Sequence, residues 1–395
     1  YGGVENLLAE GNIFNGSSTN SSSDNLSIIF GTDLLSSSRI IRNNTFNNGS
    51  VAIEIEGINT NVLAAGTRIT GNSFNNVNRG MDIRYQEDLV ITDNSLTVNG
   101  SRGIELTYCD AALEVVGNRI DQNGGGYGLY LNSCDGGVPP AGTPGLIANN
   151  FVKVSQNSAR AIRLSNATYQ NIYYNSANTP NGTASRTFEQ SGASSGNINV
   201  VNNNFAAPAG GYAYYVADPN TIVTSDYNNF YSAGNYLAHW GNNDIRDLAA
   251  LQSAGSKDAN SRSVFPHFTS NSDLHTVAPW LDGVGTTLSE VTVDIDGEAR
   301  GSSPDIGADE FTPDPTTTTP LSGILTVGSG GDYASFNEAA DDLLLKGISG
   351  SVTVEVLTDL NAYTEQVTFF EIPGTSSSDT VTFQSQSGDP ADVTL

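Results

Sequence analysis

The sequence predicts an all-β protein whose main part is a parallel β-solenoid, a coil of short strands stacked turn upon turn. A short pattern occurs four times between Arg39 and Asp135: aliphatic residues, two or three turn-prone residues including an asparagine, one further residue, then an apolar residue. A second short strand follows each copy, as in Ala52-Ile53-Glu54-Ile55. A repeat this short cannot bury its own apolar side, so its copies must stack on one another.

Composition limits the class of partner. The 395 residues carry 42 acidic and 16 basic side chains, a net charge of −26. Nucleic acid needs a basic surface and is therefore excluded as a partner. The sequence has no apolar run long enough to span a membrane. We expect a secreted, extracellular protein, and a piece of a longer chain, because the sequence begins inside a repeat and stops within a strand-like run.

Residues 1–242 are predicted to form about eight or nine rungs. An asparagine at one turn of each rung is expected, because asparagine tolerates the left-handed conformation and can bond to its own backbone. Stacked on one another, these asparagines would form a hydrogen-bonded ladder. The aligned positions are Asn12, Asn44, Asn72, Asn94, Asn118, Asn149, Asn203 and Asn228, with a less obvious rung at Asn175.

Aligning the second strands places Glu54, Asp82 and Glu105 in one outward column, which Tyr130 and Arg163 continue. Carboxylates about 5 Å apart repel one another, so one pKa should rise or a cation should bind. Three interpretations stay open: a solvated polar face, a cation site, or a catalytic face. Two inward columns are expected beside it, Ile53, Met81, Ile104, Leu129 and Ile162, and Ile55, Ile83, Leu106, Leu131 and Leu164.

The two cysteines, Cys109 and Cys134, align on successive rungs. The expected separation, roughly 4.8 Å at the Cα atoms, is one that a disulfide accepts. The pair is therefore a disulfide candidate. The alternative is two small buried residues in a ladder, since free cysteine is commonly buried.

Residues 243–311 read as a cap, because an open solenoid end exposes unpaired backbone. Ile245, Leu248 and Leu251 recur at helical spacing, with Asn243 or Asp244 as the expected N-cap and Gly255 as the expected end. The segment closes with Asp294-Ile295-Asp296-Gly297-Glu298-Ala299-Arg300 and Asp305-Ile306-Gly307-Ala308-Asp309-Glu310-Phe311.

This closing motif, with Phe265-Pro266-His267-Phe268 before it, resembles the C-terminal end of secreted bacterial right-handed parallel β-helix proteins of the pectate-lyase-like kind. The resemblance covers roughly residues 1–311 and implies a right-handed coil in a large, surface-exposed, multi-domain protein. Asp296, Gly297, Arg300, Asp305, Gly307 and Glu310 would then be structural cap residues. In related pectinases and lyases the outward face holds acid–base groups or calcium.

The cap also contains the start of a calcium-loop pattern, Asp294-Ile295-Asp296-Gly297, with Asp305 at the twelfth position. Asp294, Asp296 and Asp305 are accordingly metal candidates, and calcium is the possible ion. The alternative is a plain turn in which Asp305 or Glu310 holds Arg300.

A Pro- and Thr-rich linker is predicted at 312–322, and residues 323–395 read as the start of a second β-helix. Strands are expected at 324–327, 352–356, 366–370 and 380–384. A helix that plugs the open end should begin at Ser335 with a capping box and end at Gly347.

The sequence favours a non-enzymatic, structural or adhesive protein of a surface or filament that associates with itself. One alternative is a polysaccharide lyase or glycosidase acting through Glu54, Asp82 and Glu105. Another is a carbohydrate-binding module, favoured by the aromatic residues Tyr212, Tyr214, Tyr215, Tyr231, Tyr236 and Trp240 on the last rungs. Exposed, these would stack on sugars; inward, they would be core.

Overall fold

The computed structural model describes residues 6–17, 28–30, 36–358 and 363–393. The chain forms two compact units. The first comprises Tyr1–Ser263, Phe268–Thr276 and Gly283–Glu310, and the second comprises Val264–His267, Val277–Asp282 and Phe311–Leu395. Two short stretches of the predicted cap, 264–267 and 277–282, thus group with the second unit.

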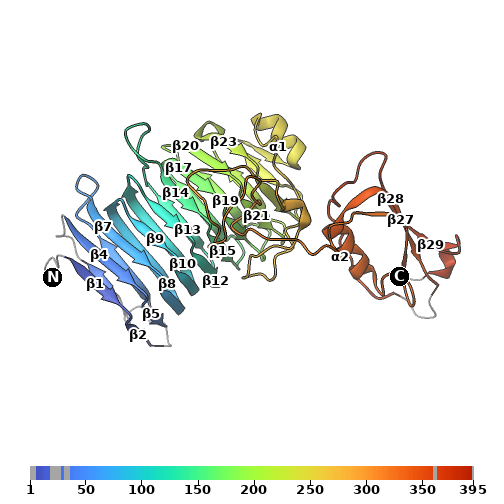
Figure 1. The fold of residues 1–395 in the computed structure, drawn as a ribbon, viewed down its shortest axis with the longest axis horizontal. Coiled ribbons are helices and arrows are strands. Elements are labelled where there is room, and N and C mark those ends of the chain that lie inside the picture. Colours follow the sequence, from blue (N-terminus) through green and yellow to red (C-terminus); the bar gives the residue numbers. More distant parts are fainter. Residues whose placement is uncertain (1–5, 18–27, 31–35, 359–362, 394–395) are drawn as a thin grey trace. The chain divides into compact units, whose positions relative to one another are not determined.

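The first unit is a parallel β-helix, which confirms the predicted fold class (Figure 1). Its strands pair in parallel along three ladders of nine strands each. The first ladder contains β1 (Leu7–Glu10), β4 (Ser36–Arg42), β7 (Ala64–Thr70), β9 (Val90–Thr92), β11 (Glu114–Val116), β14 (Gly145–Ala148), β17 (Thr168–Tyr173), β20 (Gly196–Val201) and β23 (Ile222–Asp226).

The second ladder contains β2 (Ile13–Asn15), β5 (Thr45–Asn47), β8 (Ser73–Glu87), β10 (Ser95–Asp110), β12 (Arg119–Gln122), β15 (Phe151–Val154), β18 (Ser176–Asn178), β21 (Asn204–Ala207) and β24 (Asn229–Ser232). The third contains β3 (Ile28–Phe30), β6 (Val51–Glu56), the later parts of β8 and β10, β13 (Tyr127–Asn132), β16 (Arg160–Ser165), β19 (Arg186–Ser191), β22 (Tyr212–Val216) and β25 (Ala238–Trp240). Among the described residues, the nine strands of each ladder agree with the eight or nine rungs predicted for residues 1–242, whereas the turn count of the whole chain is higher, at about 13.

The interior of the coil is apolar, as the alternation of the second strands predicts. Both inward columns are buried, with exposed fractions of 0–1%. Side chains also stack along the axis, as in the ring pairs Phe14–Phe46 and Phe46–Phe74 at 4.8 and 4.9 Å. Because each apolar side chain meets its counterparts one turn away, neighbouring rungs stabilise each other.

The predicted asparagine ladder is present. From Asn12 to Asn203, the backbone N–H and the Nδ2 of each ladder asparagine donate to the Oδ1 of the next, as Asn94 does to Asn118 at 3.1 and 2.9 Å. One position is wrong: the ladder residue is Asn150, not Asn149. Asn149 has a φ of 51° and holds the left-handed position before it, where Asn43, Asp93 and Asn202 lie on other rungs.

The ladder ends on two polar side chains. The backbone N–H of Asn228 donates to the Oγ of Ser261 at 3.0 Å. Asp258, which is buried, accepts from the hydroxyls of Ser225 and Ser261 at 2.8 Å each. Burial raises the pKa of Asp258, and the three hydrogen bonds from Ser225, Ser261 and Asn228 oppose that rise.

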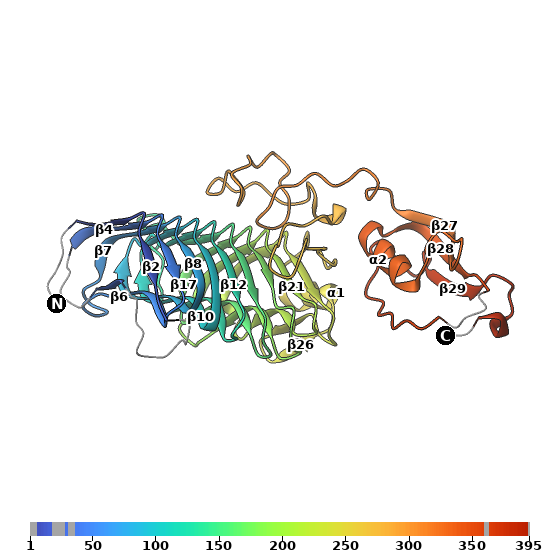
Figure 2. The same cartoon turned by 90° about the horizontal axis from the view of Figure 1, so that it is seen from below.

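The cap begins with β26 (Asn243–Ile245), which pairs antiparallel with β25, and α1 (Leu248–Gly255). The predicted N-cap at Asn243 or Asp244 is wrong, because these residues belong to β26, and Asp247 caps the helix by accepting from the N–H of Ala250. Short 3-10 turns lie at Pro219–Thr221 and Pro279–Leu281. The cap segments of the first unit, 268–276 and 283–310, have little regular structure and run along the rungs (Figure 2).

The second unit has a parallel three-stranded sheet, β27 (Leu321–Val327), β28 (Ile348–Val356) and β29 (Val381–Ser385), beside α2 (Phe336–Lys346) and a 3-10 turn at Pro390–Asp392. Ser335 caps α2 and Gly347 ends it, as predicted. The strand predicted at 366–370 does not form. The neighbouring Glu365 instead accepts from the N–H groups of Phe336 and Asn337 at the start of α2.

Candidate functional site

The outward column lies in the third ladder in the register that its sequence spacing predicts. Glu54 pairs with Asp82, and Asp82 with Glu105. Tyr130, Arg163, Glu189, Tyr215 and His239 continue the column one rung at a time. The column therefore changes from carboxylates at its beginning to arginine and aromatic residues at its end.

Arginines cover two of the carboxylates at the beginning of the column, Asp82 and Glu105. Arg84 donates to both oxygens of Asp82 at 2.9 and 3.0 Å, and Arg79 lies 3.7 Å away. The hydrogen bond with Asp82 raises the pKa of Arg84, against the opposing effect of burial. Arg102 pairs with one oxygen of Glu105. Asp82 and Glu105 are only 3% and 6% exposed, so their charges are held in ion pairs rather than presented to solvent.

The second half of the column gathers positive charge. Glu189 forms ion pairs with three arginines, Arg160, Arg163 and Arg186, at 2.8, 3.2 and 3.1 Å. One carboxylate thus faces three guanidinium groups in a chain whose net charge is −26. These four side chains carry a local net charge of +2, which is opposite in sign to the net charge of the whole protein.

Tyrosine rings lie against these guanidinium groups. Arg163 lies over the rings of Tyr127 and Tyr130, 5.1 and 4.9 Å from their centroids, and Arg186 lies 3.6 Å from that of Tyr215. Arg163 also donates to the Tyr127 hydroxyl at 2.6 Å. We call this set the arginine–tyrosine stripe: Arg160, Arg163, Arg186, Glu189, Tyr127, Tyr130 and Tyr215.

Sequence reasoning placed Arg163 in the column but missed Arg160 and Arg186. The sequence contains a signal for these two arginines, because many rungs carry two charged or aromatic residues three positions apart. They are Arg79 and Asp82, Arg102 and Glu105, Tyr127 and Tyr130, Arg160 and Arg163, Arg186 and Glu189, and Tyr212 and Tyr215. The first members are register partners of one another, so they form a second column beside the first.

A pocket of about 330 Å³ lies next to the last of these rungs. Two tyrosines, Tyr212 and Tyr236, line it. The other lining residues are small or polar: Thr183, Ala209, Gly210, Ala233, Gly234 and Asn235. The Tyr212 hydroxyl lies 2.8 Å from Asp244, and burial, then this carboxylate, raises the pKa of Tyr212 to about 12. Asp244 also pairs with His239, and that contact lowers the carboxyl pKa.

The predicted aromatic group divides between the two sides of the strands. Tyr214, Tyr231 and Trp240 are buried in the core, with exposed fractions of 0%, 4% and 6%. Tyr212 and Tyr215 are half-buried, and Tyr236 is exposed. The outward members border the stripe and the pocket.

The closing motif builds the cap around Arg300. This buried guanidinium pairs with Glu310, donates to Asn149 at 2.9 Å and to the Gly307 carbonyl at 3.1 Å, and lies 3.8 Å from the centre of the Tyr174 ring. Of the two predicted partners, Glu310 holds it. Gly297 and Gly307 have φ values of 87° and 115°, which favour glycine.

The three predicted metal ligands do not face one another as a set. Asp294 accepts from the backbone N–H groups of Asp296, Glu298 and Glu310, and Asp305 accepts from that of Gly283. These are the contacts of turn-forming carboxylates. Asp296 instead lies with His275 and Asp309.

Cys109 and Cys134 are buried free thiols on neighbouring rungs, so the disulfide that their spacing permits is not formed in this structure. The Cys109 N–H lies 3.4 Å from the sulfur of Cys134. Burial raises the pKa of the Cys109 thiol well above its ordinary value. This corresponds to the alternative of two small buried residues in a ladder.

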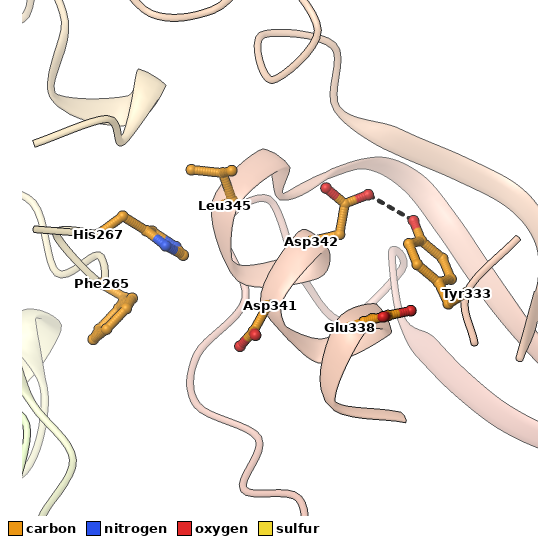
Figure 3. Close-up of a pocket in the computed structure, with 7 residues that line it drawn as sticks. All are labelled: Phe265, His267, Tyr333, Glu338, Asp341, Asp342 and Leu345. Atoms are coloured by element: carbon orange, nitrogen blue, oxygen red, sulfur yellow. Dashed lines mark hydrogen bonds between the residues drawn. The ribbon is translucent and has the colours of Figure 1, made fainter. Parts of the chain in front are cut away.

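The second unit contains a pocket of about 590 Å³, lined by Phe265, His267, Tyr333, Glu338, Asp341, Asp342 and Leu345 (Figure 3). Tyr333 bonds to Asp342 at 2.6 Å, and burial lowers the pKa of His267 to about 4. The carboxylates of this pocket all belong to α2. None of its lining residues lies on a strand of the ladder that carries the stripe.

Comparison with known proteins gives one family match. Residues 60–244 match the family described as Periplasmic copper-binding protein (NosD). No curated protein and no solved structure matches the chain. Among the described residues, no helix is long and apolar enough to cross a membrane.

Copper, which the family description names, does not fit the matched segment. Protein copper sites use imidazole and sulfur ligands. In residues 60–244 the only histidine is His239, and the sulfur atoms belong to Met81, Cys109 and Cys134, all 0% exposed. The solenoid interior therefore holds the sulfur ligands away from any ion in solvent.

Proposed function

We propose that this chain is a non-enzymatic scaffold working outside the cytoplasm, which adheres to polysaccharide through the arginine–tyrosine stripe and the adjoining pocket. The description of the matched family as periplasmic supports the location. The observation that carries the proposal is the stripe itself. Half-buried tyrosine rings offer flat apolar faces to sugars, and guanidinium groups offer hydrogen-bond donors to their hydroxyl and carboxylate groups.

The local charge favours a polysaccharide that contains sugar acids. Elsewhere the acidic protein repels a polyanion, whereas three arginines around Glu189 give this face a positive surplus. The rungs repeat along the axis, so an extended polymer can meet successive residues of the stripe. A rigid rod with an extended binding face suits adhesion.

The geometry argues against the catalytic alternative on Glu54, Asp82 and Glu105. An acid–base pair requires a carboxyl group that can exchange protons with a substrate. Asp82 and Glu105 are instead covered and ion-paired. Self-association stays a prediction, which light scattering of the purified chain tests.

The test is binding of polygalacturonate and of a neutral glucan, measured by isothermal titration calorimetry. We expect polygalacturonate to bind more tightly, and its affinity to fall as salt rises. Tyr215→Ala should weaken binding about tenfold, since a lost aromatic contact costs roughly 1.4 kcal/mol. Tyr108→Ala is the matched control, because Tyr108 stacks on Tyr85 away from the stripe, 5.6 Å between centroids.

Two outcomes would contradict the proposal. Equal losses in Tyr215→Ala and Tyr108→Ala would show that the stripe is not the binding face. Depolymerisation of the glycan that Asp82→Asn or Glu105→Gln abolishes would establish the enzyme instead. Viscometry of the same mixtures detects such depolymerisation.

A further inference from the structure

Three potential metal ligands meet in the cap of the first unit, away from the stripe. They are His275, Asp296 and Asp309, and one ligand atom from each lies within 4.8 Å of the others. They come from distant positions in the sequence, so no spacing motif reveals them. Unlike the predicted trio of aspartates, this set contains an imidazole nitrogen.

Each of these residues directly follows an anchored apolar residue. Leu274, Ile295 and Ala308 belong to one buried cluster, which also includes Phe151 of β15. The N–H of Ile295 donates to the carbonyl of Ala308 at 2.9 Å and joins two of the segments. The backbone on which the ligands stand is therefore fixed by packing, as a preorganised metal site requires.

Each ligand is also oriented from its other side. The Nδ1 of His275 pairs with Asp273, and its ring packs edge-on against Phe151 at 4.9 Å. Arg119 pairs with the Oδ1 of Asp296 at 2.6 Å, and the backbone at Thr276 bonds to Asp309.

The remaining ligand atoms of His275 and Asp296 then face one another. His275 Nε2 lies 2.7 Å from the Oδ2 of Asp296. Metal-binding histidines normally engage a carboxylate or carbonyl through the other ring nitrogen in this way.

The charge of the group is unbalanced. Asp273, Asp294, Asp296 and Asp309 surround the site, whereas Arg119 is the fixed cation that pairs with them among the described residues. The carboxylates of Asp294 and Asp296 repel that of Asp309. A divalent cation would remove this repulsion.

We propose that His275 Nε2, Asp296 Oδ2 and the carboxylate of Asp309 bind a divalent transition-metal ion of the Zn²⁺ class. One nitrogen and two carboxylate ligands suit such an ion, whereas calcium takes oxygen ligands alone. The ion replaces the proton between His275 and Asp296. Its role is to clamp the segments 268–276 and 283–310 of the cap to each other.

The experiment is calorimetric titration of the metal-free chain with Zn²⁺. We expect one ion per chain and a rise in melting temperature. His275→Gln should weaken binding at least about 100-fold, because it removes the only nitrogen ligand. Asp273→Asn keeps all three ligands and should weaken binding about 10- to 100-fold by releasing the imidazole. His239→Gln is the matched control, since His239 pairs with Asp244 elsewhere.

The proposal is overturned if the metal-free chain takes up no stoichiometric Zn²⁺, or if His275→Gln and His239→Gln behave alike. Binding of Ca²⁺ that is insensitive to His275→Gln would also overturn it. Circular dichroism establishes that each variant is folded, and Asp309→Asn replaces His275→Gln if the latter is not. Polysaccharide binding should be unchanged in the His275, Asp273 and Asp309 variants, which separates this proposal from the proposed function.

Discussion

Asn118, in the middle of the asparagine ladder, offers a direct test of how the rungs are held together. Its side chain is 0% exposed, and its Oδ1 accepts from both the backbone N–H and the Nδ2 of Asn94. Its own Nδ2 donates to Asn150 and to the carbonyl of Ile91, at 3.0 and 2.9 Å. Replacement by alanine removes this acceptor. The backbone N–H of Asn94 and one N–H of its Nδ2 then lose the oxygen to which they donate.

The expected cost follows from those two donors. Each buried polar group that loses its partner costs about 1–3 kcal/mol, so for two of them Asn118→Ala should lower the free energy of unfolding by about 2–6 kcal/mol. Asn75→Ala is the matched control, because the Asn75 side chain is exposed and donates to the side chain of Asn47 at 2.9 Å. A surface change of this kind should cost no more than about 0.5 kcal/mol.

Urea denaturation followed by circular dichroism measures both variants, and hydrogen exchange reports the Asn94 amide directly. We expect that amide to exchange faster in Asn118→Ala and to be unchanged in Asn75→Ala. If the two variants lost equal stability, or if the Asn94 amide stayed protected, the ladder would contribute nothing beyond the stacked apolar interior, and the reasoning would be refuted.

Three further outcomes are expected. Burial lowers the pKa of His267 to about 4, so the second unit should lose stability, about 3 kcal/mol, as pH falls from 6.5 to 4; His267→Gln should flatten that pH dependence of unfolding. Arg300→Ala leaves Glu310 without its ion pair and should destabilise the cap by about 3–5 kcal/mol, seen as faster proteolysis. Cys109 and Cys134 should react with a thiol reagent only as fast as the protein unfolds; immediate labelling would contradict their burial.

Periodicity explains how much of the fold the sequence predicts. A parallel coil repeats its side-chain environment every turn, so the inward residues Ile53, Met81 and Ile104 can be aligned by eye. The misplacement of Asn149 arises where two asparagines are adjacent. Both a left-handed turn and the ladder accept asparagine, and only the backbone conformation separates the two positions.

Non-repeating parts were harder to predict because their contacts are not periodic. Local patterns placed α1 but not its N-cap, since β26 forms only by pairing with β25. The cluster of His275, Asp296 and Asp309 depends on which turns of the cap meet, and no pattern in the sequence records that. The second column, which contains Arg160 and Arg186, lies three residues before the first on each rung and can be aligned from the sequence in the same way.

The asparagine ladder gives the coil a dipole moment along its axis. Along the row, each side-chain amide accepts at its oxygen from the preceding asparagine and donates from Nδ2 to the oxygen of the following one. Their dipoles therefore add, as peptide dipoles do along a helix. Asp258 lies at the positive end of that row, where its carboxylate acts as a counter-charge. The two ends of the coil are thus electrostatically unlike, and any stacking that continued the row could only proceed head to tail.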